Sequence, residues 1–238
     1  MTKEKSAYTK RADGRKIDEI REIKAKVGIV PSADGSAMFQ TGKTRAIAVV
    51  RGPRTLHPQH MQNPQKGVLR VTYNMMSFSV WDRVRPGTSR RSQEISKVTE
   101  WVLENCVDLS QFPNTVVDVL INIPQADAGT RVAGINAAVM ALAHAGVPMK
   151  EMAAAIAIGK IDKTLVVDVS KEEEDFEEGE GATDIPMCWL SRSGKLALLQ
   201  LDGKISIPEL KEALKLGKEA CKKINEIQVK ALKEFKEK

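Results

Sequence analysis

The chain has 238 residues, of which 42% are hydrophobic and 29% charged, a composition typical of a globular protein whose core needs no disulfides. No apolar run is long enough for a membrane span, and the polar N-terminus lacks a secretory signal pattern, so we expect no membrane partner. The three cysteines are scattered and form neither a disulfide framework nor a zinc motif, which predicts a reducing, cytoplasmic location.

The net charge of +6 is unevenly distributed along the chain. Residues 1–100 carry 20 Lys and Arg against 9 Asp and Glu, whereas residues 101–238 carry 17 against 22. A basic half favours a polyanionic partner such as nucleic acid. The alternative is a solvated surface on which the charges mix in three dimensions.

The first half of the chain reads mainly as strands. Residues 1–11 are polar and are predicted to be a flexible segment ahead of a single domain over residues 12–238. Alternating apolar residues separated by turn residues predict a β-meander with strands at residues 24–30, 36–40 and 44–51. Residues 52–66 hold three prolines and two histidines and are predicted to be a loop. A further strand is expected at residues 67–75, and residues 81–89 look irregular.

Helical periodicity appears in the second half. A helix is expected from Arg90, capped by Thr88 or Ser89, and another after Gly129-Thr130-Arg131, with a buried strand between them. Paired strands then flank an acidic run, Glu172 to Glu180, that is predicted to be a solvated loop. Ser206 and Glu209 fit a capping box at the start of one long amphipathic C-terminal helix. The order of strands and helices is that of an α+β fold rather than a regular βαβ alternation.

The two helix starts are candidate anion sites. The first turn of a helix offers N–H groups without intrahelical partners, and Thr130 and Arg131 would add a hydroxyl and a cationic fork there. Arg90 and Arg91 open the other helix, where positive charge opposes the helix dipole, which suggests an anionic ligand. The alternative for both is an ordinary helix start with solvated arginines.

Two further sets of residues are candidates for chemistry. Asp184 stands just before an apolar strand and could hold Mg²⁺ or donate a proton, or it could simply cap that strand. A cationic, proline-stiffened loop could contact nucleic acid, or be an ordinary surface loop. The polar side chains of this loop are Arg51, Arg54, His57 and His60.

Several segments together resemble the RNase PH family, and most closely its catalytic members from the archaeal exosome. Each segment alone is a weak signal, but they occur in the family order and span about residues 12–235. The segments are Asp13-Gly14-Arg15, residues 33–37, Gly52-Pro53-Arg54 with His57-Pro58 and His60, Ser89-Arg90-Arg91, residues 125–131 and residues 145–149.

The resemblance implies two related β/α halves with helices packed on mixed sheets, and phosphorolytic 3′→5′ degradation of RNA to nucleoside diphosphates. Arg91 matches the family arginine that holds phosphate, and Gly129, Thr130 and Arg131 match the phosphate-binding turn. Arg90 and the loop of Arg51, Arg54, His57 and His60 are assigned to RNA binding. The co-substrate would be inorganic phosphate.

The resemblance also implies two active-site carboxylates that hold Mg²⁺ or Mn²⁺. Asp184, in Thr183-Asp184-Ile185-Pro186, matches the second of them. The first lies six residues earlier in the family, but the loop of this chain looks about three residues longer. Asp175 of the Glu174-Asp175 pair is therefore assigned as the first carboxylate, with Glu178 as its rival.

The implied assembly is a hexameric ring in which active subunits alternate with an inactive RNase PH-like paralogue, covered on one face by RNA-binding cap subunits. Arg131 and Asp184 are both present, which favours the active type of subunit. Two alternatives stay open at this point. One is a non-catalytic ring subunit that only binds RNA, and the other is a stand-alone RNase PH that trims tRNA 3′ ends.

Overall fold

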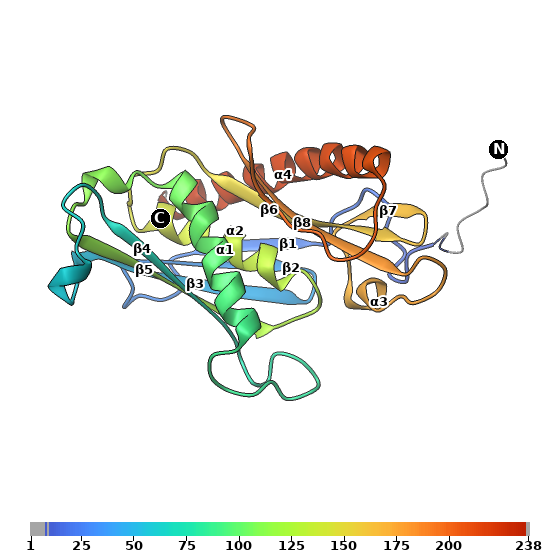
Figure 1. The fold of residues 1–238 in the computed structure, drawn as a ribbon, viewed down its shortest axis with the longest axis horizontal. Helices are drawn as coiled ribbons and strands as arrows, with labels where there is room; N and C mark the ends of the chain where they lie inside the picture. The colour runs from blue at the N-terminus through green and yellow to red at the C-terminus, as the bar shows by residue number, and fades with distance from the viewer. Residues whose placement is uncertain (1–7, 9, 237–238) are drawn as a thin grey trace.

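Two β-sheets and three long helices make up the molecule, as a computed structural model shows for residue 8 and residues 10–236 (Figure 1). The first sheet has the strand order β1-β2-β3-β5-β4. Neighbouring strands are antiparallel except for β4 and β5, which run parallel. The strands are β1 (Ile23–Val27), β2 (Gly35–Thr41), β3 (Thr44–Thr55), β4 (Val68–Met75) and β5 (Thr115–Gln125).

The second sheet is antiparallel and smaller, with the strand order β7-β6-β8-β9. All nine residues of β6 are buried, because this strand lies inside the sheet and is covered by helices on its faces. The strands are β6 (Ala153–Ile161), β7 (Thr164–Val167), β8 (Ala182–Leu190) and β9 (Leu196–Leu199).

The helix α2 (Thr130–His144) lies between the sheets and packs on β2, β3 and β5 of the first and on β6 of the second. Its small apolar residues surround the whole helix, a composition expected for a buried helix. The helix α1 (Arg90–Cys106) covers β4, and α4 (Ile207–Lys236) covers β6 and β1. The remaining helices are short: α3 (Lys171–Glu174), η1 (Gln59–Met61) and η2 (Leu109–Gln111).

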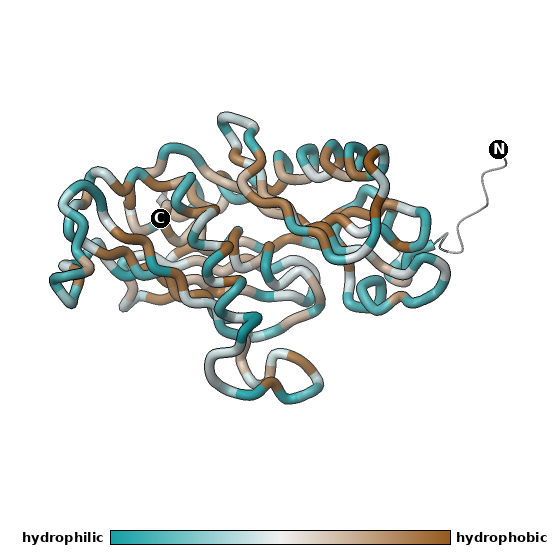
Figure 2. Tube along the Cα trace, in the orientation of Figure 1, coloured by the Kyte–Doolittle hydropathy of each residue, from teal (hydrophilic) through white to brown (hydrophobic). Residues whose placement is uncertain are grey.

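Hydrophobic segments follow the strands and the inner helix, whereas most surface loops are hydrophilic; the projecting loop between β4 and α1 is mixed and contains a hydrophobic stretch (Figure 2). One large core cluster draws residues from both sheets and from α1, α2 and α4. The two halves therefore share a core. Within the described part of the chain, no helix is long and apolar enough to cross a membrane.

Most predicted elements are present, with several differences. The first strand ends at Val27, and β8 begins at Ala182, so Asp184 lies within that strand rather than just before it. The third strand continues to Thr55 through a register irregularity between Arg51 and Arg54, so the predicted loop begins later than residue 52. A short helix, α3, stands within the acidic run. The predicted flexible segment falls mostly on residues 1–7 and 9, outside the described residues, but Arg11 at its end is 2% exposed.

Candidate active site

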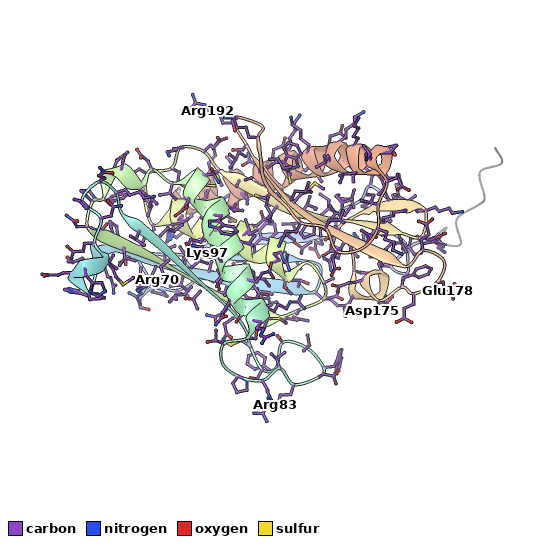
Figure 3. The ribbon with its side chains drawn as sticks, in the orientation of Figure 1. Arg70, Arg83, Lys97, Asp175, Glu178 and Arg192 are labelled. Carbon is purple, nitrogen blue, oxygen red and sulfur yellow. The ribbon has the colours of Figure 1, made fainter. Side chains whose placement is uncertain are left out.

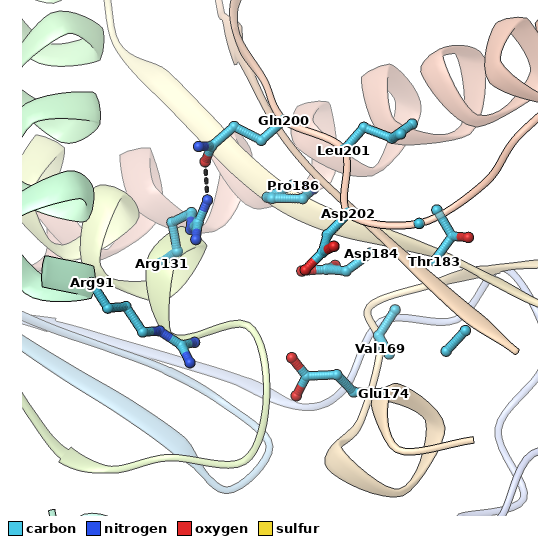
Figure 4. Close-up of a pocket in the computed structure, with 12 residues that line it drawn as sticks. Arg91, Arg131, Val169, Glu174, Thr183, Asp184, Pro186, Gln200, Leu201 and Asp202 are labelled. Carbon is cyan, nitrogen blue, oxygen red and sulfur yellow. Dashed lines mark hydrogen bonds between the residues drawn. The ribbon is translucent and has the colours of Figure 1, made fainter. Parts of the chain in front are cut away.

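A cavity of about 540 Å³ opens between two chemically different walls (Figure 4). Arg91 and Arg131, from the N-terminal ends of α1 and α2, lie on one wall. The other wall is built by α3, β8 and the segment after β9, and carries Glu174, Asp184 and Asp202. The positive ends of two helices therefore face three carboxylates across one space.

The α1 end of the basic wall is held by its own first turn. Ser89 is the N-cap, and its hydroxyl accepts a hydrogen bond from the Ser92 N–H at 3.0 Å, while the Ser92 hydroxyl accepts from the Ser89 N–H at 2.9 Å. This cap fixes the start of the helix, from which Arg91 extends to the cavity. The neighbouring Arg90 is exposed and does not line the cavity.

The α2 end is built differently. Gly129 is the N-cap, in the left-handed region with φ +63°, and no side chain in the described part of the chain caps the helix. The first N–H groups are thus available to an anionic ligand. Arg131 forms an ion pair with Glu94 at 3.4 Å and donates to the side-chain oxygen of Gln200, which holds the guanidinium at the cavity.

Asp184 and Asp202 lie side by side on the acidic wall. The N–H of each residue donates to the carbonyl oxygen of the other at 2.9 Å, which closes an antiparallel bridge. Residues directly opposite each other in such a bridge project their side chains from the same face. Both carboxylates therefore face the cavity.

The Asp184 carboxyl group is poorly solvated. Its pKa is raised to about 6, mainly by burial and next by the negative charge of Glu174; Asp202 adds to the shift, and Arg131 opposes it. Its Oδ1 atom is buried and has no hydrogen-bond partner among the described residues. An unpartnered, buried carboxylate oxygen is costly unless a ligand or proton satisfies it.

The predicted first carboxylate, Asp175, does not line the cavity. Its side chain is exposed and bonds to Lys171 at 2.7 Å, and the rival Glu178 is also exposed (Figure 3). Glu174 lines the cavity in its place. Asp175 follows Glu174 directly at the end of α3, so its side chain points about 100° further around the helix axis. The role of Asp175 stays a prediction that its position does not support.

The predicted RNA-binding loop lies far from the cavity. Thr55, next to Arg54, pairs with Thr115 at the start of β5, whereas the phosphate turn follows Gln125 at the end of that strand. The length of β5 therefore separates the two regions by roughly 33 Å. Arg54 forms an exposed ion pair with Asp34 at 3.6 Å. The histidines of this loop, His57 and His60, are exposed, and Arg51 is half-buried.

Sequence reasoning missed Glu94, Gln200 and Asp202. Gln200 and Glu94 hold Arg131, and the Gln200 amide also donates to Glu94 at 2.8 Å. Only Asp202 carried a usable local signal, as an acidic residue between an apolar strand and a glycine. Its pairing with Asp184 depends on a bridge that the sequence does not show.

Comparison with known proteins gives the family. The model of domain 1 of the 3′ exoribonuclease family (RNase_PH) matches residues 19–148, and the model of domain 2 matches residues 151–220. This chain belongs to the 3′ exoribonuclease family. The expected RNase PH-like α+β fold is confirmed, and so, at the level of the family, is the expected phosphate-dependent 3′→5′ exoribonuclease activity.

Relatives of known name cover most of the chain. The exosome complex component Rrp41 of Thermococcus kodakarensis is 49% identical over 225 residues, which are 94% of this chain and 89% of that protein. The component of the same name from Methanopyrus kandleri is 45% identical over 224 residues, 94% of this chain and 92% of that one.

Two solved structures share the fold of this chain. Rice Rrp46 superposes with a TM-score of 0.81 at 24% identity, over 93% of this chain and 100% of that one. A chain of the Archaeoglobus fulgidus exosome with RNA bound to the active site superposes with a TM-score of 0.77 at 22% identity, over 91% and 92%. At these identities the structural likeness shows the fold alone.

Proposed function

We propose that this chain is the catalytic subunit of an exosome of the archaeal type, which removes nucleotides from RNA 3′ ends with inorganic phosphate and releases nucleoside diphosphates. One observation carries the residue assignment. Arg91, Arg131 and the uncapped start of α2 face Asp184 across a single cavity. A reaction between two anions needs such a site, because positive groups must bring the anions together.

The basic wall is assigned to the attacking phosphate. Arg91, the Arg131 guanidinium and the N–H groups of Gly129 and Thr130 hold and orient it for in-line attack on the last phosphodiester. A new P–O bond forms to the attacking phosphate as the bond to the 3′ oxygen of the preceding nucleotide breaks. The reaction replaces a phosphodiester bond of RNA by the phosphoanhydride bond of a nucleoside diphosphate, and this exchange is readily reversible. Abundant nucleoside diphosphate would therefore drive the reverse reaction, in which nucleotides are added to the RNA 3′ end.

Asp184 is assigned to the leaving group. Its pKa of about 6 keeps a usable fraction of the carboxyl group protonated near neutral pH. A general acid works best when its pKa lies near the working pH. Asp184 therefore supplies the proton that the departing 3′ oxygen takes up directly or, when its carboxylate is ionised and holds a cation, positions the water that would give this proton.

The acidic wall also fits a divalent cation, Mg²⁺ or Mn²⁺. The unpartnered Oδ1 of Asp184 and the neighbouring Asp202 carboxylate offer the oxygen ligands that such ions prefer. No group of three or more ligating side chains forms a cage among the described residues, and Mg²⁺ commonly binds one or two carboxylates together with a substrate phosphate. When bound, the ion would neutralise charge on the scissile phosphate. Asp175, the ligand expected from the family, would need to turn inward to join it.

The proposed partners are RNA, an inactive RNase PH-like paralogue in a hexameric ring, and RNA-binding cap subunits. Exposed Arg90 and the loop of Arg51, Arg54, His57 and His60 would guide RNA toward the cavity. The β9 edge fits a subunit contact, because Leu196 and Leu199 are 38% and 40% exposed on it. A cytoplasmic location remains part of the proposal.

The test follows a labelled RNA with the purified chain, alone and together with the paralogue, with phosphate added or omitted. We expect loss of RNA only with phosphate, and nucleoside diphosphates as products. Monophosphates released without phosphate would make the chain a hydrolase. RNA binding without degradation in either state would favour the non-catalytic ring subunit, and full activity without the paralogue would favour the stand-alone enzyme.

A further inference from the structure

The turn that precedes α2 has an unfavourable backbone. Ala128 has φ +55° and Gly129 has φ +63°, two consecutive residues in the left-handed region. Glycine adopts this region at little cost, but alanine does not. A strained turn persists only where surrounding contacts hold it. In this chain, contacts from both sheets do so.

Thr44 holds the turn from the first sheet. Its hydroxyl donates to the Ala128 carbonyl oxygen at 2.7 Å and accepts from the Asp127 N–H at 2.9 Å. Thr44 is the first residue of β3 and is fully buried. One buried hydroxyl therefore bridges the peptide group that precedes Asp127 and the peptide group that follows Ala128.

Arg21 holds the same turn from the other side. Its Nη1 donates to the Asp127 carbonyl oxygen at 2.6 Å, while Nε and Nη2 form a fork on the Asp168 carboxylate at 2.9 and 2.8 Å. The Arg21 backbone N–H also donates to Asp168 at 2.8 Å. Both side chains are buried, and Asp168 directly follows β7 of the second sheet. Arg21 thus connects the phosphate turn to the other half of the molecule.

The same N-terminal segment holds the acidic wall. Nε and Nη2 of Arg11 form a fork on Glu173 at 2.7 and 2.8 Å, and its guanidinium also donates to the carbonyl oxygens of Val167 and Asp168 at 2.8 Å. Glu173 adjoins Glu174, which lines the cavity. Residues 11–21 therefore contact the supports of both walls.

We propose that Thr44, Arg21 and Asp168 are positioning residues that hold the strained turn and so aim the first N–H groups of α2 at the attacking phosphate. None of the three lines the cavity, so they act through Asp127, Ala128 and Gly129. The inference rests on the proposed function only for the identity of the anion. The holding of the turn itself is a separate claim.

The test compares Thr44→Val, which keeps the shape but removes the hydroxyl, with Thr44→Ser, which keeps the hydroxyl. Arg70→Ala is the control, because it removes an arginine that forms an exposed ion pair with Asp118 away from the cavity. Amide hydrogen exchange of residues 127–131, the phosphate concentration at half-maximal rate and the maximal rate are measured on the full chain in its assembled state.

In Thr44→Val we expect the amides of residues 127–131 to exchange about tenfold faster, with residues 90–94 unchanged, as befits the loss of two hydrogen bonds. The phosphate concentration at half-maximal rate should rise about tenfold, whereas the maximal rate and RNA affinity change much less. Thr44→Ser should restore both readouts, and Arg21→Lys, which loses the fork on Asp168, should resemble Thr44→Val.

A folded Thr44→Val chain with parental exchange at residues 127–131 would overturn the proposal. Faster exchange with an unchanged phosphate requirement would overturn it too, since the residues would then hold the turn without aiming it. If the parent chain itself neither binds phosphate nor degrades RNA, the proposed function fails, while the exchange comparison still decides whether Thr44 and Arg21 hold the turn.

Discussion

The two walls of the cavity differ in how they are built. Arg91 and Arg131 each stand in the first turn of a long helix, of 17 and 15 residues. On the acidic wall, Glu174 belongs to a helix of four residues, and Asp202 follows a strand of four residues. The side chains of the basic wall project from the starts of two long helices, whereas those of the acidic wall stand on short elements and on a bridge between distant segments.

This contrast corresponds to a division of labour. Rigid helix starts suit the binding of a small anion, because their N–H groups and dipoles are already oriented. The acidic wall holds the group with the displaced pKa, Asp184, as expected where chemistry occurs. Changes to the two walls should therefore affect different kinetic parameters.

The largest effect is expected for Asp184→Asn, which keeps the size of the side chain but removes its charge and proton. The rate of RNA degradation should fall about 10²–10⁴-fold, the usual contribution of general acid catalysis. RNA binding should survive, because removing a carboxylate near a polyanion does not weaken Coulomb attraction. Single-turnover rates and RNA affinity provide the measurement. A folded variant that assembles and degrades RNA at the parental rate would remove Asp184 from the mechanism.

The second carboxylate is expected to have the next largest effect. The candidates are compared by the rate of RNA degradation at saturating phosphate in four single variants: Glu174→Gln, Asp175→Asn, Glu178→Gln and Asp202→Asn. On the geometry described, Asp202→Asn should cost roughly 10²-fold, a loss typical of removing one electrostatic contact to the reacting group, and Glu178→Gln should cost little. If Asp175→Asn is the most damaging of the four, the α3 segment turns inward when substrate binds.

A smaller effect is expected from Arg131→Gln on the basic wall. The phosphate concentration at half-maximal rate should rise by about 10- to 100-fold, because a hydrogen-bonded charge on the anion is lost. High phosphate should then recover most of the maximal rate. Lys97→Ala is a matched control on α1, since Lys97 is exposed, pairs with Glu100 and does not line the cavity.

The pH dependence of stability checks the pKa of Asp184 independently of catalysis. The folded pKa of about 6 lies above the unfolded 3.8, so ionisation destabilises the fold as pH rises from about 4 to 6. Asp184→Asn removes this cost and should raise the melting temperature by roughly 5 °C above pH 6, and hardly at all below pH 4. A constant difference across that range would mean that Asp184 titrates normally. The charges of Glu174, Asp202 and Arg131 also shift the pKa of Asp184. The melting temperature is therefore measured against pH in Asp202→Asn as well.

The smallest effect is expected in the RNA loop. Arg54→Ala with His57→Ala should weaken binding a fewfold for RNA that is long enough to reach from the cavity to the loop. Short RNA and the phosphate requirement should be unaffected, because roughly 33 Å of β5 separates the loop from the turn. Equal weakening for short and long RNA would place the loop on a different path.

Local sequence signals predicted the basic wall better than the acidic wall. The starts of α1 and α2 follow from the Ser89 cap, Gly129 and helical periodicity, which act over a few positions. The orientation of Arg131 depends in addition on the distant residues Glu94 and Gln200. Asp202 faces Asp184 only because the chain returns after a hairpin and pairs there. The orientation of Asp175 depends on where α3 ends, a boundary that an acidic run does not reveal.

The central claim is that one wall binds phosphate and the other carries out the chemistry. A phosphate titration of the single-turnover rate, with parent, Arg131→Gln and Asp184→Asn side by side, tests it most directly. We expect Arg131→Gln to shift the half-saturating phosphate concentration and Asp184→Asn to lower the maximal rate without that shift. If both variants move the same parameter, or if the parental rate does not depend on phosphate, the account is contradicted.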